Sequence, residues 1–238
     1  MLKVNDIRSR FADKLVNKDF IIDKSGVKLL EIIGASFIVD QPSIFREPNM
    51  DYVSREIKWY NSQSLNVNDI PGNTPKIWQQ VADKDGFINS NYGWCIFNED
   101  NGNQYENTLT ELLSNPNSRR AIMIYNRPSM HEDYNKNGMS DFMCTNAVQY
   151  LIRNNELNAI VQMRSNDSVF GFLNDYQWQL YVLNLLTNNI NSQKSAEEKI
   201  GIGNIYWNAG SLHVYERHFD LVQEYIDNSE LEDYNYEW

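Results

Sequence analysis

The order of strand-like and helix-like stretches is the feature that most constrains the fold of this chain. Apolar stretches rich in β-branched residues predict strands, and apolar residues at helical spacing predict helices. The expected strands are residues 27–39, 121–126, 142–153, 157–164, 203–207 and 211–216, and the expected helices are residues 50–60, 105–114 and 175–190. These elements are interspersed without strict strand–helix–strand alternation, which favours an α+β fold with a mixed sheet over a doubly wound fold.

Two local signals refine the expected sheet, and the length limits the number of domains. Gly34 interrupts the apolar stretch 27–39, where a bulge or bend is expected. The turn residues Asn154-Asn155-Glu156 separate two strand-like stretches and predict a hairpin. The 238 residues show no internal repeat or low-complexity linker, so we expect one continuous domain over residues 1–238.

Charge is distributed unevenly along the chain. There are 21 Lys and Arg residues against 32 Asp and Glu, which gives a net charge of −11. Acidic residues concentrate beyond Tyr215, where Arg217 is the one basic residue, and they form an acidic C-terminal tail from about residue 221. A chain this acidic repels duplexes, so polymeric nucleic acid is not an expected partner. A local cluster of arginines can still hold a small anion.

The cysteine count and the N-terminus bear on the compartment. Cys95 and Cys144 alone cannot form a disulfide scaffold for a chain of this length. No segment resembles a secretory signal or approaches the roughly 18 apolar residues of a membrane span, so we expect a soluble, cytoplasmic protein with no membrane partner. Cys95 lies among aromatic residues and is expected in the core, whereas Cys144 is either a packing residue or a nucleophile.

The expected helix 50–60 contains the most informative acidic residue. At about 100° per residue, Glu56 falls within the apolar face formed by Val53, Trp59 and Tyr60. A carboxylate that faces the core has a raised pKa because burial disfavours its charged form, as a proton-handling group requires. Glu56 is therefore either a functional group or a buried glutamate paired with a structural arginine.

Two pairs of polar residues lie at the ends of expected elements. Arg119 and Arg120 stand between a helix end and a buried strand, where they form either a solvated corner or a fork that binds phosphate bidentately. Asn174 and Asp175 stand at the start of the expected helix 175–190, where an N-cap is the default role for either residue.

The histidines and acidic residues do not predict a metal site. Residues 133–138 (DYNKNG) match the first half of a calcium-binding loop, but Cys144 occupies the position that must supply a bidentate carboxylate. His213 and His218 are five residues apart with no cysteine nearby, which is poor spacing for zinc. His213 instead alternates with Tyr215 on a strand, so their polar ends share one face.

Eight segments together resemble one protein family. They are IIGASF (32–37), TPKIWQQVA (74–82), INSNYGW (88–94), NSRR (117–120), GMSDFMCTN (138–146), MRSND (163–167), FGF-x-ND (170–175) and SLHVY (211–215). In this order they resemble the thymidylate synthase family, and most closely its branch of deoxycytidylate (dCMP) hydroxymethylases of T-even-type bacteriophages. The resemblance covers roughly residues 17–220 and leaves out the first 16 residues and the acidic tail.

The resemblance implies a fold, a reaction and a set of site residues. The fold is a mixed, kinked β-sheet with flanking helices, and two subunits pack sheet to sheet as a homodimer. The reaction transfers a one-carbon unit from 5,10-methylenetetrahydrofolate to carbon 5 of a pyrimidine nucleotide, and no metal is implied. By position, Cys144 matches the nucleophile, Glu56 the glutamate that organises water and protons, and Tyr92 a tyrosine near the abstracted proton. The further matches are Lys24, Arg164 and Ser165 as phosphate ligands, Arg119 and Arg120 as the arginine pair that reaches the neighbouring subunit's phosphate, His213 and Tyr215 on the deoxyribose hydroxyl, and Trp78 and Asp167 on the folate side with Glu56.

Two departures from the synthases of this family indicate the substrate and the product. Asp175 replaces an asparagine, and its carboxylate can accept a hydrogen bond from the amino group of cytosine, which predicts dCMP rather than dUMP. Thr145 replaces a histidine, which favours the hydroxymethylase branch and a product of 5-hydroxymethyl-dCMP. The ending YNYEW also differs from the short apolar tail of the synthases. The alternatives are a dCMP or dUMP methylase and an inactive scaffold in a nucleotide-synthesis complex; a phage protein would act in the host cytoplasm.

Overall fold

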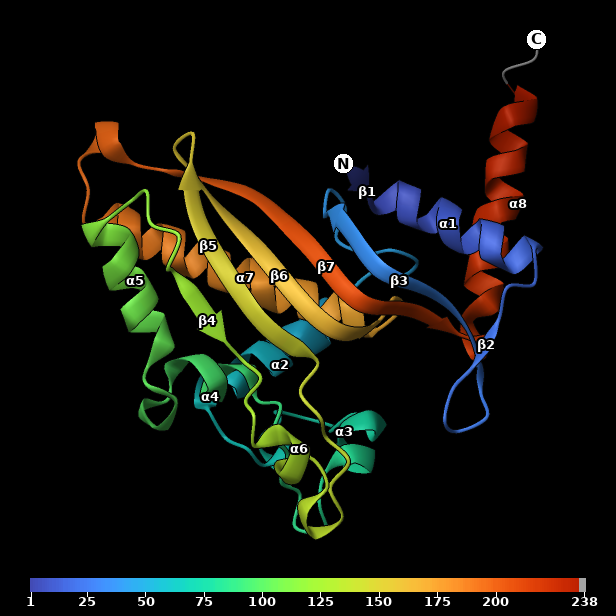
Figure 1. Cartoon of the computed structure of the whole chain (residues 1–238), viewed down its shortest axis with the longest axis horizontal. Helices are drawn as coiled ribbons and strands as arrows, with labels where there is room; N and C mark the ends of the chain where they lie inside the picture. The colour runs from blue at the N-terminus through green and yellow to red at the C-terminus, as the bar shows by residue number, and fades with distance from the viewer. Residues whose placement is uncertain (236–238) are drawn as a thin grey trace. The chain divides into compact units, whose positions relative to one another are not determined.

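The computed structural model describes residues 1–235, which combine helices with strands (Figure 1). The strands are β1 (Leu2–Lys3), β2 (Ile21–Ile22), β3 (Lys28–Ile38), β4 (Ile122–Ile124), β5 (Thr145–Arg153), β6 (Glu156–Asp167) and β7 (Gly201–Tyr215). The α-helices are α1 (Val4–Val16), α2 (Met50–Ser62), α3 (Lys76–Val81), α4 (Tyr92–Phe97), α5 (Gln104–Ser114), α6 (Met130–Asp133), α7 (Gly171–Ser192) and α8 (Phe219–Asn235).

The chain divides into two compact units. Unit 1 contains residues 1–48, 163–177 and those from 206 onward, and unit 2 contains residues 49–162 and 178–205. Strands β6 and β7 and helix α7 each run from one unit into the other. The expectation of a single domain over residues 1–238 stays a prediction.

Unit 1 contains a mixed sheet built around β3. Strand β1 pairs with β3 in parallel, whereas β2 and β7 pair with it antiparallel, and the end of β6 follows β7 in the strand order. The β3–β7 ladder passes from the pair Ile33–Ser211 to the pair Ala35–Ala209 and skips Gly34. Gly34 has a φ of 65°, a conformation that glycine adopts without steric cost, so the predicted bend is confirmed.

Helices α1 and α8 also belong to unit 1, where they are in contact and cross each other (Figure 1). Helix α1 buries Val4, Ile7 and Phe11, and the hydroxyl of Tyr225 on α8 lies 3.0 Å from that of Ser9 on α1. The acidic stretch predicted as a tail from about residue 221 is therefore mostly a helix that packs on α1. The last three residues of the ending YNYEW lie outside the described residues.

Unit 2 contains the other part of the strands and most of the helices. Its strand order is β4-β5-β6-β7, and β4 pairs with β5 antiparallel. Asn154 and Asn155 connect β5 to β6 with φ values of 54° and 58°, which confirms the predicted hairpin turn. Trp59 and Trp178 are fully buried in this unit, and α4 packs against both α2 and α5.

Several boundaries differ from the expectations: β5 begins at Thr145 instead of residue 142, β6 extends to Asp167 instead of residue 164, and the differences at β7 and α7 are larger. Strand β7 is continuous over Gly201–Tyr215, where two short strands were predicted. Helix α7 begins at Gly171, so Asn174 and Asp175 lie inside the helix and the N-cap prediction for them is wrong. Among residues 1–235, no helix has the length and apolar character needed to cross a membrane.

Candidate active site

Helix α2 presents Glu56 to the interior of unit 2. The side chain of Asn49 accepts a hydrogen bond from Tyr52 N at 3.2 Å and so caps the helix start. The apolar face predicted from the sequence is buried, and Glu56 on it is only 4% exposed. Burial raises the pKa of Glu56 to about 7, while hydrogen bonds from Tyr52, Trp78 and Tyr60 partly oppose this shift. Its described donors are thus aromatic side chains and not a structural arginine.

Tyr52 and Trp78 hold the carboxylate of Glu56 from one side. The Tyr52 hydroxyl donates to Oε1 of Glu56, and Trp78 Nε1 donates to the Tyr52 oxygen at 2.9 Å and to Oε1 of Glu56 at 3.3 Å. Burial and the neighbouring carboxylate raise the pKa of Tyr52 well above its usual value, so the phenol keeps its proton and remains a donor. Two residues predicted from the resemblance, Glu56 and Trp78, are therefore in direct contact.

Aromatic rings extend from Trp78 to Tyr92 within unit 2. Trp78 meets the edge of Trp59 at 5.2 Å between ring centroids, and Trp59 stacks on Tyr60 at the same spacing. Tyr60 in turn stacks on Tyr92, the first residue of α4, at 5.2 Å. Tyr92 is buried, and its ring meets the edge of Tyr125 at 5.3 Å. These contacts fix the ring of Tyr92 relative to α2, which carries Glu56.

The two thiols of unit 2 have different environments. Cys144 immediately precedes β5 and is half-buried, with its Sγ 3.8 Å from the carbonyl oxygen of Phe142. Cys95 lies in α4 and is 2% exposed, and burial raises the pKa of its thiol to about 12. The prediction that Cys95 belongs to the core is confirmed, and Cys144 is the more accessible thiol.

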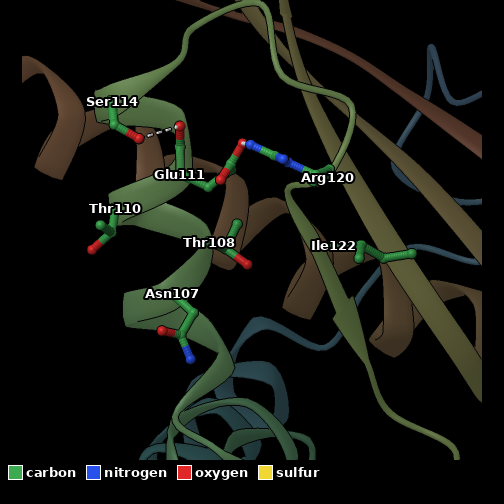
Figure 2. A pocket seen from close by; sticks show the side chains of 7 residues that line it. All are labelled: Asn107, Thr108, Thr110, Glu111, Ser114, Arg120 and Ile122. Carbon is green, nitrogen blue, oxygen red and sulfur yellow. Dashed lines mark hydrogen bonds and ion pairs between the residues drawn. The ribbon is translucent and has the colours of Figure 1, made fainter.

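Arg119 and Arg120 are exposed between α5 and β4. The guanidinium of Arg120, whose side chain is 78% exposed, forms a 3.0 Å ion pair with Glu111 of α5. Glu111 also accepts a hydrogen bond of 2.5 Å from the buried Ser118. Figure 2 shows this pair at the edge of a surface pocket of about 360 Å³. The ion-pair partner of Arg120 thus lies outside the predicted catalytic set, and phosphate binding by Arg119 and Arg120 stays a prediction.

In unit 1, Asp175 belongs to a buried hydrogen-bonded chain. Asn166 Nδ2 donates to Oδ2 of Asp175 at 2.7 Å, and Trp207 Nε1 donates to Oδ1 of Asn166 at 3.2 Å. Asn166 and Trp207 are buried. Because α7 begins at Gly171, Asp175 lies in its second turn, where the carboxylate meets the end of β6.

A second polar group of unit 1 lies on β3 and β7. The Ser211 hydroxyl donates to Glu31 and lies 3.3 Å from Nδ1 of His213. Burial lowers the pKa of His213, which favours the neutral imidazole near pH 7. The His213 ring meets the edge of Tyr215 at 5.0 Å. Their predicted proximity on one strand is confirmed, and Arg217 lies 4.5 Å from the centroid of the Tyr215 ring.

The remaining predicted residues of unit 1 occupy strand ends and turns. Lys24 is exposed in a turn that the carboxylate of Asp23 stabilises by accepting from the backbone N–H of Ser25 at 2.8 Å and of Val27 at 3.0 Å. Arg164 and Ser165 stand near the end of β6 and Asp167 at its last residue, where Asp167 accepts from the backbone of Val169 and Phe170 just before α7. Among the described residues, no three His, Cys, Asp or Glu side chains gather as metal ligands would.

Comparisons with known proteins decide the family. The thymidylate synthase family model matches residues 27–235. The chain belongs to the thymidylate synthase family. It is 58% identical to the deoxycytidylate 5-hydroxymethyltransferase of Enterobacteria phage T2, over 100% of this chain and 98% of that relative. The enzyme of the same name from phage T4 is 58% identical over 96% of this chain and 93% of its own length. A thymidylate synthase of Francisella tularensis subsp. holarctica is 25% identical over 88% of this chain and 79% of its own length.

Family membership confirms the resemblance drawn from the eight segments and corrects its extent. The sequence-based match ends near residue 220, whereas the family model continues to residue 235 and the phage T2 relative aligns with the whole chain. The first 16 residues and the acidic stretch, now helices α1 and α8, are therefore shared with the phage relatives.

Sequence reasoning missed two polar residues that contact the predicted site, Tyr52 and Asn166, and a third, Asp141, that lies three positions before Cys144 in the chain. Tyr52 lies one turn before Glu56 on the same helix, so the spacing of four residues could have identified it. Asn166 is revealed only by its contacts with Asp175 and Trp207, the latter 41 residues away. Asp141 is similarly revealed by its bonds to residues about 50 positions earlier in the chain.

Proposed function

We propose that this protein transfers a one-carbon unit from 5,10-methylenetetrahydrofolate to carbon 5 of dCMP with addition of water. The products are 5-hydroxymethyl-dCMP and tetrahydrofolate. The relatives named for this activity align with nearly the entire chain, which supports the proposal. The observation that carries the choice of cytosine is the carboxylate of Asp175, which a hydrogen bond from Asn166 orients and whose oxygens accept from amino groups.

Cys144 is the proposed nucleophile. Its thiolate adds to carbon 6 of the pyrimidine, and carbon 5 then attacks the methylene carbon of the folate co-substrate. Loss of the carbon 5 proton, close to Tyr92, and release of tetrahydrofolate leave an exocyclic methylene group on the nucleotide. Water adds to this methylene and the thiolate leaves from carbon 6, so the nucleotide gains CH₂O. The carbon 5 proton and one proton of the water balance the two hydrogens that the folate nitrogens gain when tetrahydrofolate is released.

Glu56 is the proposed group that positions the water and accepts its proton. A carboxylate with a pKa of about 7 can exchange a proton near neutral pH, and the bonds from Tyr52 and Trp78 fix its orientation. The same mechanism assigns Trp78 and Asp167 to the folate side of the site.

The nucleotide's phosphate and sugar take the other proposed ligands. The phosphate is bound within one subunit by Lys24, Arg164 and Ser165. It is also bound by the partner's Arg119 and the partner's Arg120. The neutral His213 and Tyr215 bind the deoxyribose hydroxyl.

The homodimer is part of this proposal. Large apolar side chains are exposed on the strands of each unit: Ile33 on β3 is 81% exposed, and Ile122 and Ile124 on β4 are 41% and 55% exposed. A second copy that packs sheet to sheet would remove such side chains from water, which favours association.

Mass spectrometry of the nucleotide product tests the reaction. Purified protein is incubated with methylenetetrahydrofolate and either dCMP or dUMP. The proposal expects a product from dCMP that is heavier by CH₂O and little product from dUMP. A gain of CH₂ with formation of dihydrofolate would instead identify a methylase, and the absence of any product would contradict an enzymatic role.

A further inference from the structure

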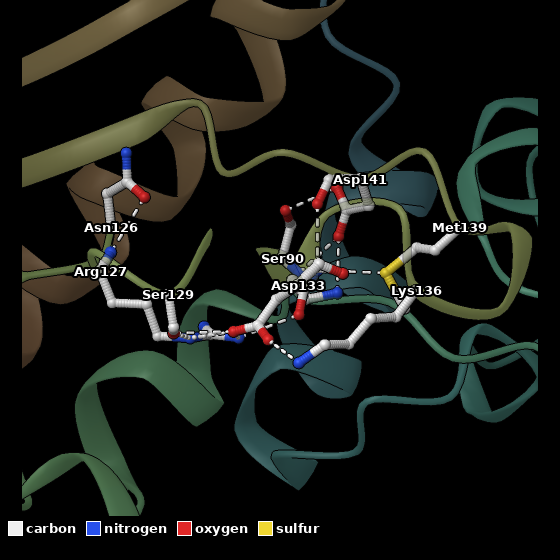
Figure 3. A network of polar contacts seen from close by, with 9 residues as sticks. Ser90, Asn126, Arg127, Ser129, Asp133, Lys136, Met139 and Asp141 are labelled. Atoms are coloured by element: carbon white, nitrogen blue, oxygen red, sulfur yellow. Dashed lines mark hydrogen bonds and ion pairs between the residues drawn. The ribbon is translucent and has the colours of Figure 1, made fainter. Parts of the chain in front are cut away.

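A buried carboxylate, Asp141, connects the segment that leads to Cys144 with the start of α4. Asp141 is three residues before Cys144, and its Oδ2 accepts from the backbone N–H of Asn89 at 2.6 Å and of Ser90 at 2.8 Å. Its Oδ1 accepts from the Ser90 hydroxyl at 2.7 Å. Asn89 Nδ2 donates back to the carbonyl oxygen of Asp141 at 3.1 Å. Figure 3 shows Ser90 beside Asp141, with the hydrogen bond between their side chains.

Asn91, the residue after Ser90, connects the segment before α4 to α2. Asn91 is fully buried, and its side chain accepts from Trp94 N at 2.8 Å and so caps α4. Its amide donates to the carbonyl oxygen of Trp59 at 3.1 Å and of Ser64 at 2.8 Å. Trp59 follows Glu56 by three residues on α2. The consecutive residues Asn89, Ser90 and Asn91 therefore connect the segment before Cys144, through bonds to Asp141, with the helix that carries Glu56, through the bond to Trp59.

Close packing of α4 on α2 reinforces this connection. A Cβ atom at Gly93 would lie 1.8 Å from the carbonyl oxygen of Tyr60, so only glycine allows the two backbones to approach this closely. Tyr92, the residue before Gly93, is thereby held against α2 as well. We call Asn89, Ser90, Asn91 and Asp141 the brace.

We propose that Asp141 is a positioning residue, which through the brace holds the Cys144 thiol at a fixed place relative to Glu56 and Tyr92. This inference rests on the proposed function, in which these three side chains act on one nucleotide. A buried carboxylate that loses a hydrogen-bond donor pays the full cost of desolvation, so the brace resists displacement. Covalent attack on carbon 6 requires the sulfur to lie at near-contact distance above the face of the pyrimidine ring. A displacement of 1 Å can reduce the rate about 100-fold.

The test compares Asp141→Asn with Asp133→Asn. The asparagine at position 141 turns an NH₂ group either toward a backbone N–H, which then loses its acceptor, or toward the Ser90 hydroxyl, which must then accept instead of donate, so at least one bond of the brace is lost or reversed. Asp133 lies in the same network, paired with Arg127 at 3.0 Å and Lys136 at 2.5 Å. Its carboxylate is joined to the brace indirectly, through Arg127, which also donates to Oδ1 of Asn89 at 3.0 Å. We expect kcat of Asp141→Asn to fall about 10- to 100-fold with the KM for dCMP changed less than about 3-fold. Asp133→Asn should retain the wild-type kcat.

Thiol reactivity supplies a readout that is independent of turnover. The rate of alkylation of Cys144 by iodoacetamide, followed against pH by peptide mass spectrometry, should change in Asp141→Asn and not in Asp133→Asn. Ser90→Ala removes a single donor and should show a smaller change in the same direction, which keeps the test available if Asp141→Asn does not fold. Wild-type kcat and alkylation in both brace variants would overturn the inference, whereas an inactive wild-type protein would overturn the proposed function.

Discussion

The side-chain amide of Asn166 donates a hydrogen bond of 2.7 Å to the carboxylate of Asp175. Trp207 fixes the direction of this amide, because an indole N–H is only a donor and the oxygen of Asn166 must face it. The NH₂ group of Asn166 must therefore face residue 175, which has to present an acceptor there. Asn166 and Trp207 together therefore require an acceptor atom on the side of residue 175 that faces Asn166.

Asp175→Asn should invert the nucleotide preference. The carbonyl oxygen of the new asparagine has to face Asn166, so its NH₂ group remains for the base and matches the carbonyl of uracil rather than the amino group of cytosine. We expect the ratio of kcat/KM for dCMP to that for dUMP to fall roughly 10²- to 10⁴-fold. Parallel assays with both nucleotides measure this ratio. An unchanged ratio would contradict the role given to Asp175, and Asn166→Ala should reduce the ratio less because the carboxylate remains.

Tyr52→Phe should move the pH profile of turnover. The Tyr52 hydrogen bond stabilises the ionised form of Glu56 and opposes the effect of burial, so its loss raises the pKa of Glu56 above about 7. If the ionised carboxylate accepts the proton of water, the acidic limb of kcat against pH shifts to higher pH in the variant. A profile that coincides with that of the wild type would show that Glu56 does not control this limb.

Glu56→Gln should change how stability depends on pH. The folded-state pKa of Glu56 is raised to about 7, so folding favours the protonated form. Its contribution to the free energy of unfolding is fully present below the unfolded pKa near 4.5 and is lost as pH rises to about 7. We expect the wild type to lose about 3 kcal/mol between these pH values relative to Glu56→Gln. Denaturant unfolding of both proteins at each pH measures the difference, and parallel curves would contradict the raised pKa.

Local sequence signals identified the elements whose determinants are close in the chain. The periodicity of α2 placed Glu56 on a buried face because the helix and its apolar residues lie within one short segment. Gly34 and the Asn154-Asn155 turn were likewise identified because a positive φ is a local requirement.

Boundaries set by contacts outside the predicted segment were misplaced. The start of α7 was misplaced because Asp167 arranges the preceding turn and the helix then begins at Gly171. Strand β7 was predicted as two strands, residues 203–207 and 211–216. In the structure Gly210 instead allows the strand to continue beside β6, where a Cβ atom would lie 2.8 Å from the carbonyl oxygen of Arg164.

The two thiols should differ in function and in reactivity. Cys144→Ser should abolish turnover because a hydroxyl is a far weaker nucleophile than a thiolate. Cys95→Ala should remain active, because Cys95 is buried in α4 and its pKa is raised to about 12. Peptide mapping after brief treatment with iodoacetamide should find the label on Cys144 well before Cys95. Appreciable turnover by Cys144→Ser would contradict its role as the nucleophile.

Mixing two inactive variants should restore activity if Arg119 and Arg120 serve the neighbouring subunit's site. One variant carries Arg119→Ala and Arg120→Ala, and the other carries Cys144→Ser. In a hybrid dimer the first subunit keeps Cys144 and receives both arginines from the second, so one of its two sites is intact. Random exchange at equal amounts makes half of the dimers hybrid, so about a quarter of the wild-type activity should return.

The matched control mixes Cys144→Ser with Glu56→Gln, whose residues belong to the same subunit's site and whose hybrid has no intact site. Hybrid dimers detected by differently tagged subunits but without activity in the first mixture would show that each subunit supplies its own arginines.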